Sequence, residues 1–101
     1  MNVVNAIAKV RFSSARPQRV QIHKGRGLLV EMLCLESAQK LRVEAGERAY
    51  YVVTGTAVVS AGGEKATLPA GQAAAFARDE PHEIATAGDG RLILLALTRT
   101  G

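Results

Sequence analysis

Apolar residues along this chain come in short runs that turn-forming residues separate. From residue 19 onward each run spans four to eight positions and borders a glycine, a proline or a charged residue. Short apolar runs bounded in this way are typical of packed β-strands, because an amphipathic helix repeats its apolar residues every three or four positions over a longer stretch. The pattern predicts eight strands, at residues 20–23, 28–35, 49–53, 56–61, 65–68, 73–77, 82–86 and 92–98.

The turns between these runs predict how the strands pair. Residues 61–64, Ala-Gly-Gly-Glu, form the clearest hairpin turn, because two consecutive glycines readily adopt the positive φ angles that two-residue turns require. No segment between predicted strands is long enough for a helix that crosses between parallel neighbours, so antiparallel pairing is expected. The sequence therefore predicts an all-β fold, an antiparallel jelly-roll β-barrel in a single domain.

The first nine residues carry mixed signals. Their alanines and isoleucine permit a short helix, whereas two valines favour a strand, and we predict a short N-terminal helical turn. Pro17 ends any helix at or before Arg16, because proline disfavours the helical conformation of the residue that precedes it. We accordingly divide the chain into an N-terminal arm, residues 1–18, and a barrel, residues 19–101.

Composition limits the kinds of protein that this chain can be. Its 101 residues, 48% of them apolar, suffice for one hydrophobic core. The single cysteine, Cys34, excludes an internal disulfide and a cysteine-based zinc cage. The longest uninterrupted apolar run, residues 92–97, is far shorter than the roughly 20 residues that a membrane-spanning helix needs. We expect a cytoplasmic protein that has no membrane among its partners.

Positive charge is concentrated near the N-terminus. The net charge is +4, from 13 Lys and Arg against nine Asp and Glu, and residues 1–30 contain six of the bases and no acid. Such a segment attracts phosphates, but binding of single-stranded nucleic acid also needs aromatic side chains on which bases stack, and Phe12 is the only aromatic there. We therefore do not expect a nucleic-acid partner. The basic segment instead favours solubility and attraction of anionic metabolites.

Three motifs in the second half of the chain resemble those of the cupin family. They are Tyr-Tyr-Val-Val-Thr-Gly at residues 50–55, Leu-Pro-Ala-Gly at 68–71 and Pro-His at 81–82. The resemblance extends from about residue 28 to residue 98 and implies the cupin-type barrel. In that family, three histidines and one glutamate from two motifs converge inside the barrel on a divalent transition metal.

The family's metal ligands are mostly missing from this chain. With Gly55 as the closing glycine of the first motif, Arg48 occupies the glutamate position. The histidine pair falls on Arg42 and Glu44, or on residues 41 and 43 if the spacer is one residue longer. In the second motif only His82 matches a ligand.

A metal ion therefore lacks the donors it needs. Divalent transition metals require three or more nitrogen, sulfur or carboxylate ligands, and His82 with Glu44 offers two at best. The guanidinium of Arg48 has no lone pair to donate, and at about 5 Å it repels a cation by ~3 kcal/mol per unit charge. We expect no metal and no other cofactor.

Our hypothesis for the site replaces the metal with an arginine. We expect Arg48 to point inward in alternation with Tyr50, to pair with Glu44, and to face His82 across the barrel. The predicted ligand-binding residues are Arg42, Glu44, Arg48, Tyr50 and His82, and no catalytic residue is predicted. An arginine fork binds a carboxylate, and the hydroxyl and imidazole add directional hydrogen bonds. A shift of one residue in register would instead place Glu47 inside and partly restore a metal site with His82.

The chain's 17 alanines allow two interpretations. Small side chains inside a barrel leave room for a ligand, but small side chains also let two sheets or two subunits approach closely. The predicted strand at residues 28–35 is apolar on both faces, which indicates a central position or a covering partner. We predict a homodimer, which the resemblance to small cupins also implies.

Three functions remain open from the sequence. The first is a metal-independent binding module for a small, anionic molecule whose identity the sequence does not reveal. The second is a metal-dependent cupin enzyme, such as a dioxygenase, isomerase or decarboxylase, that uses His82 with unconventional ligands. The third is a dimeric scaffold whose barrel is filled by its own side chains. The fold does not choose among them, because one fold hosts many chemistries.

Overall fold

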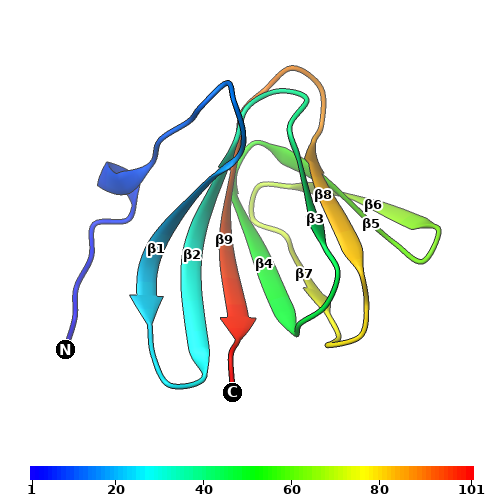
Figure 1. The fold of residues 1–101 in the computed structure, drawn as a ribbon. Coiled ribbons are helices and arrows are strands. Elements are labelled where there is room, and N and C mark those ends of the chain that lie inside the picture. The colour runs from blue at the N-terminus through cyan, green and yellow to red at the C-terminus, as the bar shows by residue number, and fades with distance from the viewer.

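Two antiparallel β-sheets form the framework of the molecule in a computed structural model that describes all 101 residues (Figure 1). The five-stranded sheet has the order β1-β2-β9-β4-β7, and the four-stranded sheet has the order β3-β8-β5-β6. The strands are β1 Gln18–Lys24, β2 Leu28–Leu35, β3 Lys40–Val43, β4 Arg48–Thr54, β5 Thr56–Ala61, β6 Glu64–Pro69, β7 Ala73–Phe76, β8 His82–Thr86 and β9 Leu92–Arg99. The predicted all-β jelly-roll class is confirmed.

All eight predicted strands are present, and the structure adds a ninth. The additional strand is β3, Lys40–Val43, which pairs antiparallel with β8. Its sequence, Lys-Leu-Arg-Val, is only four residues long and half charged, so it lacks the apolar run on which the prediction relied. The N-terminal helical turn is also present, as one turn of 3-10 helix at Ile7–Lys9. No helix in the structure is long and apolar enough to cross a membrane.

The main hydrophobic core lies between the two sheets. Alternate residues of each strand point inward, because successive side chains of a strand face opposite sides. Twelve buried residues make up this core: Leu33, Leu35, Tyr50, Val52, Ala57, Val59, Leu68, Phe76, Ile84, Leu92, Leu94 and Ala96. Every strand except β1 and β3 contributes to it. The barrel interior is therefore occupied by side chains along most of its length.

A second, smaller core lies on the outer face of the five-stranded sheet. Val20, Met32 and Cys34 are buried there beneath three residues of the N-terminal arm, Ala6, Val10 and Phe12. Further contacts hold the arm in place, since the Gln39 side chain donates a hydrogen bond to the Ser13 carbonyl at 2.7 Å. This packing explains why β2 is apolar on both faces: one face lies in the core, and the arm covers the C-terminal half of the other.

Gly55 lies where the chain passes from one sheet to the other. It separates β4 in the five-stranded sheet from β5 in the four-stranded sheet and has a φ angle of +89°. A Cβ atom at this position would overlap the carbonyl oxygen of Arg91. Glycine is therefore needed here for two independent reasons, the backbone conformation and the close approach of another strand.

Candidate functional site

The first strand residues of the cupin-like motif point alternately into and out of the barrel. Tyr50 and Val52 are at most 1% exposed and face the core. Arg48 shares their face, and it is paired across the sheet with the buried Thr98. Glu47 lies on the opposite face, where its carboxylate accepts a hydrogen bond from Arg99 at 3.2 Å. The register thus directs Arg48 rather than Glu47 toward the inner side.

A hydrogen-bonded pair, Tyr50 and His82, lies at the centre of the barrel. The Tyr50 hydroxyl is 2.7 Å from Nε2 of His82, and Nδ1 of His82 is 2.9 Å from the carbonyl oxygen of Glu80. Because a carbonyl oxygen can only accept, Nδ1 carries the proton in a neutral ring and Nε2 accepts from the tyrosine. Phe76 stacks on the imidazole with ring centroids 3.9 Å apart and planes within 9°. His82 is 0% exposed, so these contacts enclose it completely.

Burial also favours the protonated form of Tyr50. Loss of solvent raises the pKa of the Tyr50 hydroxyl above its ordinary value, because the phenolate would have to exist in a poorly solvated interior. The positive charge of Arg48 acts in the opposite direction and does not cancel the effect of burial. The hydroxyl therefore remains protonated at neutral pH and can donate a hydrogen bond to Nε2 of His82.

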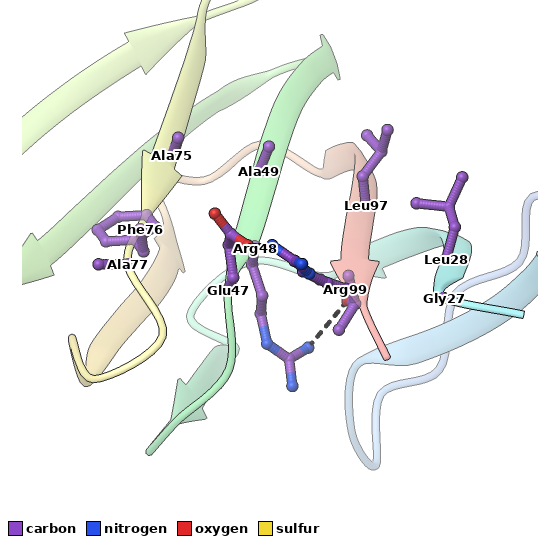
Figure 2. Close-up of a pocket in the computed structure, with 11 residues that line it drawn as sticks. Gly27, Leu28, Glu47, Arg48, Ala49, Ala75, Phe76, Ala77, Leu97 and Arg99 are labelled. Carbon is purple, nitrogen blue, oxygen red and sulfur yellow. Dashed lines mark hydrogen bonds and ion pairs between the residues drawn. The ribbon is translucent and has the colours of Figure 1, made fainter. Parts of the chain in front are cut away.

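Arg48 differs from this pair because its hydrogen-bonding capacity is largely unused. Nη1 donates to the Thr98 hydroxyl at 3.4 Å, and the Nε–H is buried without any partner. The guanidinium extends beyond the start of β4 (Figure 2). A Cβ atom built on Gly46 would lie within 4 Å of it. A cation is thus held at the open end of the barrel with donors available, near the position that holds the glutamate ligand in cupins.

An ion pair that the sequence prediction did not single out lies on the same inner face. Arg19 of β1 and Glu31 of β2 approach to 3.5 Å, and the Glu31 side chain is only 13% exposed. Glu31 is paired across the sheet with Ala96, which in turn is paired with Tyr50. The signal was visible in the sequence, because Glu31 is the only charged residue in the apolar run 28–35.

The structure does not bring Arg42 and Glu44 to this site. Leu41 and Val43 take the inward positions of β3, and Val43 is paired with His82. Arg42 is therefore turned outward, and its guanidinium forms an exposed ion pair with Glu44 at 2.9 Å. The expected pairing of Glu44 with Arg48 is wrong, because Arg42 faces the solvent side of β3 and Glu44, the residue after the strand, pairs with it.

The residues at the family's metal-ligand positions do not fit a metal ion. The inward residues of β3 and β4 at these positions are Leu41, Val43 and Arg48, which leaves His82 as the single donor. No group of three or more His, Cys, Asp or Glu residues anywhere in the structure is placed to share a metal. Two hydrocarbon side chains and a permanent cation cannot complete a coordination sphere. No chemical step can therefore be assigned to a bound metal at these residues.

Neither Tyr50 nor His82 lines a pocket. The inward-facing alanines Ala61 and Ala74 border only a depression of about 210 Å³ beside Val59 and Phe76. Ala73 and Ala75 of β7 are exposed on the outer face, whereas Phe76 fills the inner side of the same strand. The largest depression, about 520 Å³, is consequently on the outside of the five-stranded sheet. Figure 2 shows Ala49, Ala75 and Leu97 directed away from the side on which the Arg48 guanidinium lies.

A second pocket, entirely polar in its lining, opens at the end of the barrel near Arg48. It measures about 440 Å³ and is lined by Gly46, Glu47, Arg78, Arg99, Thr100 and Gly101. Gly46 connects the two features, because it lines this pocket and a Cβ atom built on it would lie 3.6 Å from Nε of Arg48. Two arginines and one glutamate line this pocket, and Arg78 has no ion-pair partner. The local excess of positive charge suits an anion.

Comparison with known proteins supplies the family context. A family model described as "Cupin domain" matches residues 34–98. The chain is similar to TT1209 from Thermus thermophilus, with 24% identity, a TM-score of 0.90 and coverage of 98% of this chain and 97% of that one. It is also similar to a conserved protein with a double-stranded β-helix domain from Klebsiella pneumoniae, with 20% identity, a TM-score of 0.87 and coverage of 100% and 91%.

A third similar structure belongs to a regulatory protein. It is the cupin domain of an XRE-family transcriptional regulator from Enterobacter cloacae, with 18% identity, a TM-score of 0.76 and coverage of 84% of this chain and 97% of that one. No curated protein matches the chain. Identities this low establish a shared fold and leave the function to be argued from the residues themselves.

Proposed function

The chain belongs to the cupin domain family, and within that family we propose that it is a metal-independent binding module for a small anionic molecule. The observation that carries this proposal is Arg48. Its guanidinium lies at the barrel opening with a buried Nε–H that has no hydrogen-bond partner. A buried donor without a partner is costly, and a carboxylate or phosphate oxygen would satisfy it.

Charge around the opening supports an anion over a neutral molecule. Arg78 and Arg99 line the adjoining polar pocket, and Glu47 is the only acid among its lining residues. Because Arg99 already pairs with Glu47 at 3.2 Å, Arg48 and Arg78 remain as the cations available to a ligand. A pocket of about 440 Å³ accommodates a molecule of metabolite size.

The interior network has a positioning role in this proposal. Tyr50 and His82 are fully enclosed, so they cannot contact a ligand without a rearrangement of Phe76. They instead fill the barrel behind Arg48, in the region where cupins hold their metal, and keep water away from the inner side of the guanidinium. A charge-assisted hydrogen bond from Arg48 contributes about 1.5–3 kcal/mol, a factor of roughly ten to a hundred in affinity.

Calorimetric titration of the purified protein with inorganic phosphate, succinate and benzoate tests the proposal. We expect at least one of these anions to bind, with an affinity that falls as salt is added, and Arg48→Gln and Arg78→Gln to weaken it about tenfold or more. Arg42→Gln is the matched control, because Arg42 is an exposed arginine on the other sheet, already paired with Glu44. It should bind like the unmodified protein.

Two results would overturn this function. Binding that persists unchanged in Arg48→Gln would show that the guanidinium is not the ligand's partner. Binding or turnover that requires a divalent metal and disappears with a chelator would favour the metal-dependent enzyme. The packed interior supports the dimeric scaffold as a second candidate, and it would be favoured if none of the three anions bound.

A further inference from the structure

An apolar depression lies on the outer face of the five-stranded sheet, next to the polar pocket at the end of the barrel. It measures about 520 Å³, and Ala49 lines it together with its cross-strand neighbours Ala75 and Leu97. Leu28 of β2 also lines it and is 42% exposed. Figure 2 shows the side chains of Ala49, Ala75 and Leu97 directed to the same side. A depression of this size and lining is typical of a site for an apolar group.

The depression and the polar pocket meet at an ion pair. Glu47 and Arg99 line both of them, and the two side chains approach to 3.2 Å. Arg48, whose Nε–H is buried without a partner, lines the depression as well. Arg78 lines the polar pocket. Neither Arg48 nor Arg78 forms an ion pair, so apolar surface adjoins two cations that no acid neutralises.

The spacing along β4 gives the distance between the charged and the apolar part. Glu47 extends the pairing of β4 with β9, because its carbonyl accepts a hydrogen bond from the Arg99 amide at 3.1 Å. Ala49 follows two residues later, about 7 Å along an extended strand. A ligand that is anchored at the barrel opening and extends along the sheet therefore reaches the apolar lining within a few carbon atoms.

We propose that the ligand of this module is a free amphiphilic carboxylate with an aliphatic chain of medium length. Its carboxylate is held by Arg48 and Arg78, and its chain lies in the depression on Ala49, Ala75 and Leu97. This inference rests on the proposed function, because it takes the anion site at Arg48 as the place where the ligand is anchored. It adds the chemical class of the ligand and a second subsite.

The contact between the two sites is the reason to assign the depression to part of a small molecule. A second copy of the chain or an apolar peptide would cover the depression, but neither would by itself supply an anion to the Nε–H of Arg48. A fully polar anion would satisfy the arginines and leave the apolar lining exposed to water. A single molecule with a charged end and an apolar chain satisfies both features.

The dependence of affinity on chain length follows from this arrangement. The first methylene groups cross the charged row of Glu47 and Arg99, so acetate and butanoate should bind within about threefold of each other. Each further methylene enters the depression and should raise affinity about two- to fourfold, because part of its apolar surface leaves water. Octanoate should therefore bind at least about tenfold more tightly than butanoate.

Calorimetric titration with acetate, butanoate, hexanoate and octanoate, below the concentration at which micelles form, measures this dependence. Hexanamide is the uncharged control for the carboxylate. It has a chain of the same length but cannot form a charge-assisted hydrogen bond with an arginine, so it should bind at least about tenfold more weakly than hexanoate.

A substitution in the depression tests where the chain lies. Ala75→Gln places a polar side chain of neutral charge among the apolar residues and should remove most of the gain between butanoate and octanoate. Ala66→Gln is the matched control, because it makes the same change at an exposed position on the four-stranded sheet that does not line the depression. It should retain the full gain. Circular dichroism shows whether both variants are folded.

The results separate this proposal from the function on which it rests. Affinity that is the same for all four carboxylates but still requires Arg48 would leave the anion-binding module standing and overturn the apolar subsite. Retention of the full gain in Ala75→Gln would also overturn the subsite. Octanoate binding that weakens as the protein is concentrated would do so too, because a second copy would then cover the depression. Affinity that rises with chain length and is unchanged in Arg48→Gln would instead overturn the anion site, and with it the assigned position of the carboxylate.

Discussion

The hydrogen bond between Tyr50 and His82 should stabilise the fold measurably, and Tyr50→Phe removes it without changing the shape of the core. The substitution deletes one hydroxyl from a side chain that is 1% exposed and leaves Nε2 of His82 buried without a partner. An unsatisfied buried acceptor costs about 1–3 kcal/mol. Since about 1 kcal/mol shifts the midpoint of a 100-residue domain by ~4–8 °C, we expect Tm to fall by roughly 5–20 °C.

Tyr51→Phe is the matched control for this measurement. Tyr51 is the neighbouring residue on the same strand, is 43% exposed and donates no side-chain hydrogen bond. Its hydroxyl is solvated in both states, so its removal should change the free energy of unfolding by less than about 0.5 kcal/mol. Urea unfolding followed by circular dichroism, at one protein concentration, gives both values, and an unchanged m value shows that the unfolded states are comparable.

The reasoning is refuted if Tyr50→Phe and Tyr51→Phe are equally stable. That result would mean that the hydroxyl and the imidazole do not form a net favourable bond in the folded protein, despite their separation of 2.7 Å. It would also remove the argument that the barrel interior is held by a specific polar network rather than by hydrophobic packing alone.

Other consequences of the structure can be checked in the same assay. Burial raises the pKa of Tyr50. The stabilising effect of the protonated hydroxyl is therefore complete below the ordinary tyrosine pKa of about 10, and it is lost as pH rises through the higher pKa of the folded state. The difference in unfolding free energy between the unmodified protein and Tyr50→Phe should accordingly shrink above about pH 10. Gly55→Ala should lower the free energy of unfolding in urea by about 3 kcal/mol or more, because the new Cβ would overlap the Arg91 carbonyl. Gly63→Ala is the control, since Gly63 also has a positive φ but has nothing within 4 Å of the new Cβ. It should lose only the ~1–2 kcal/mol of backbone strain. Equal losses would show that the overlap is relieved by movement. Arg48→Met removes a buried donor that has no partner and should leave stability unchanged or raise it by up to about 1 kcal/mol; a loss above 1 kcal/mol would indicate that the guanidinium is satisfied in the folded protein.

Much of the fold follows from local patterns that the sequence displays directly. Alternating apolar residues and glycine-containing turns specify strands, because a strand must bury one face and a tight turn must adopt positive φ angles. Eight strands were predictable for this reason. The resemblance to the cupin motif, with Gly55 as its closing glycine, equally implied that Arg48 stands at a ligand position.

Only the tertiary structure decided which faces are inside and what they enclose. Alternation shows that residues i and i+2 share a face, but the pairing of distant strands determines whether that face meets the core or the solvent. Strand β3, too short and too charged to be predicted, turned Arg42 outward because its partner β8 buries the opposite side. Likewise, Ala75 faces outward because Phe76 stacks on His82 inside the barrel. Long-range pairing thus put the largest depression, floored by Ala49 and Ala75, on the outer surface, whereas Arg48 has the inward-facing side that its alternation with Tyr50 predicted.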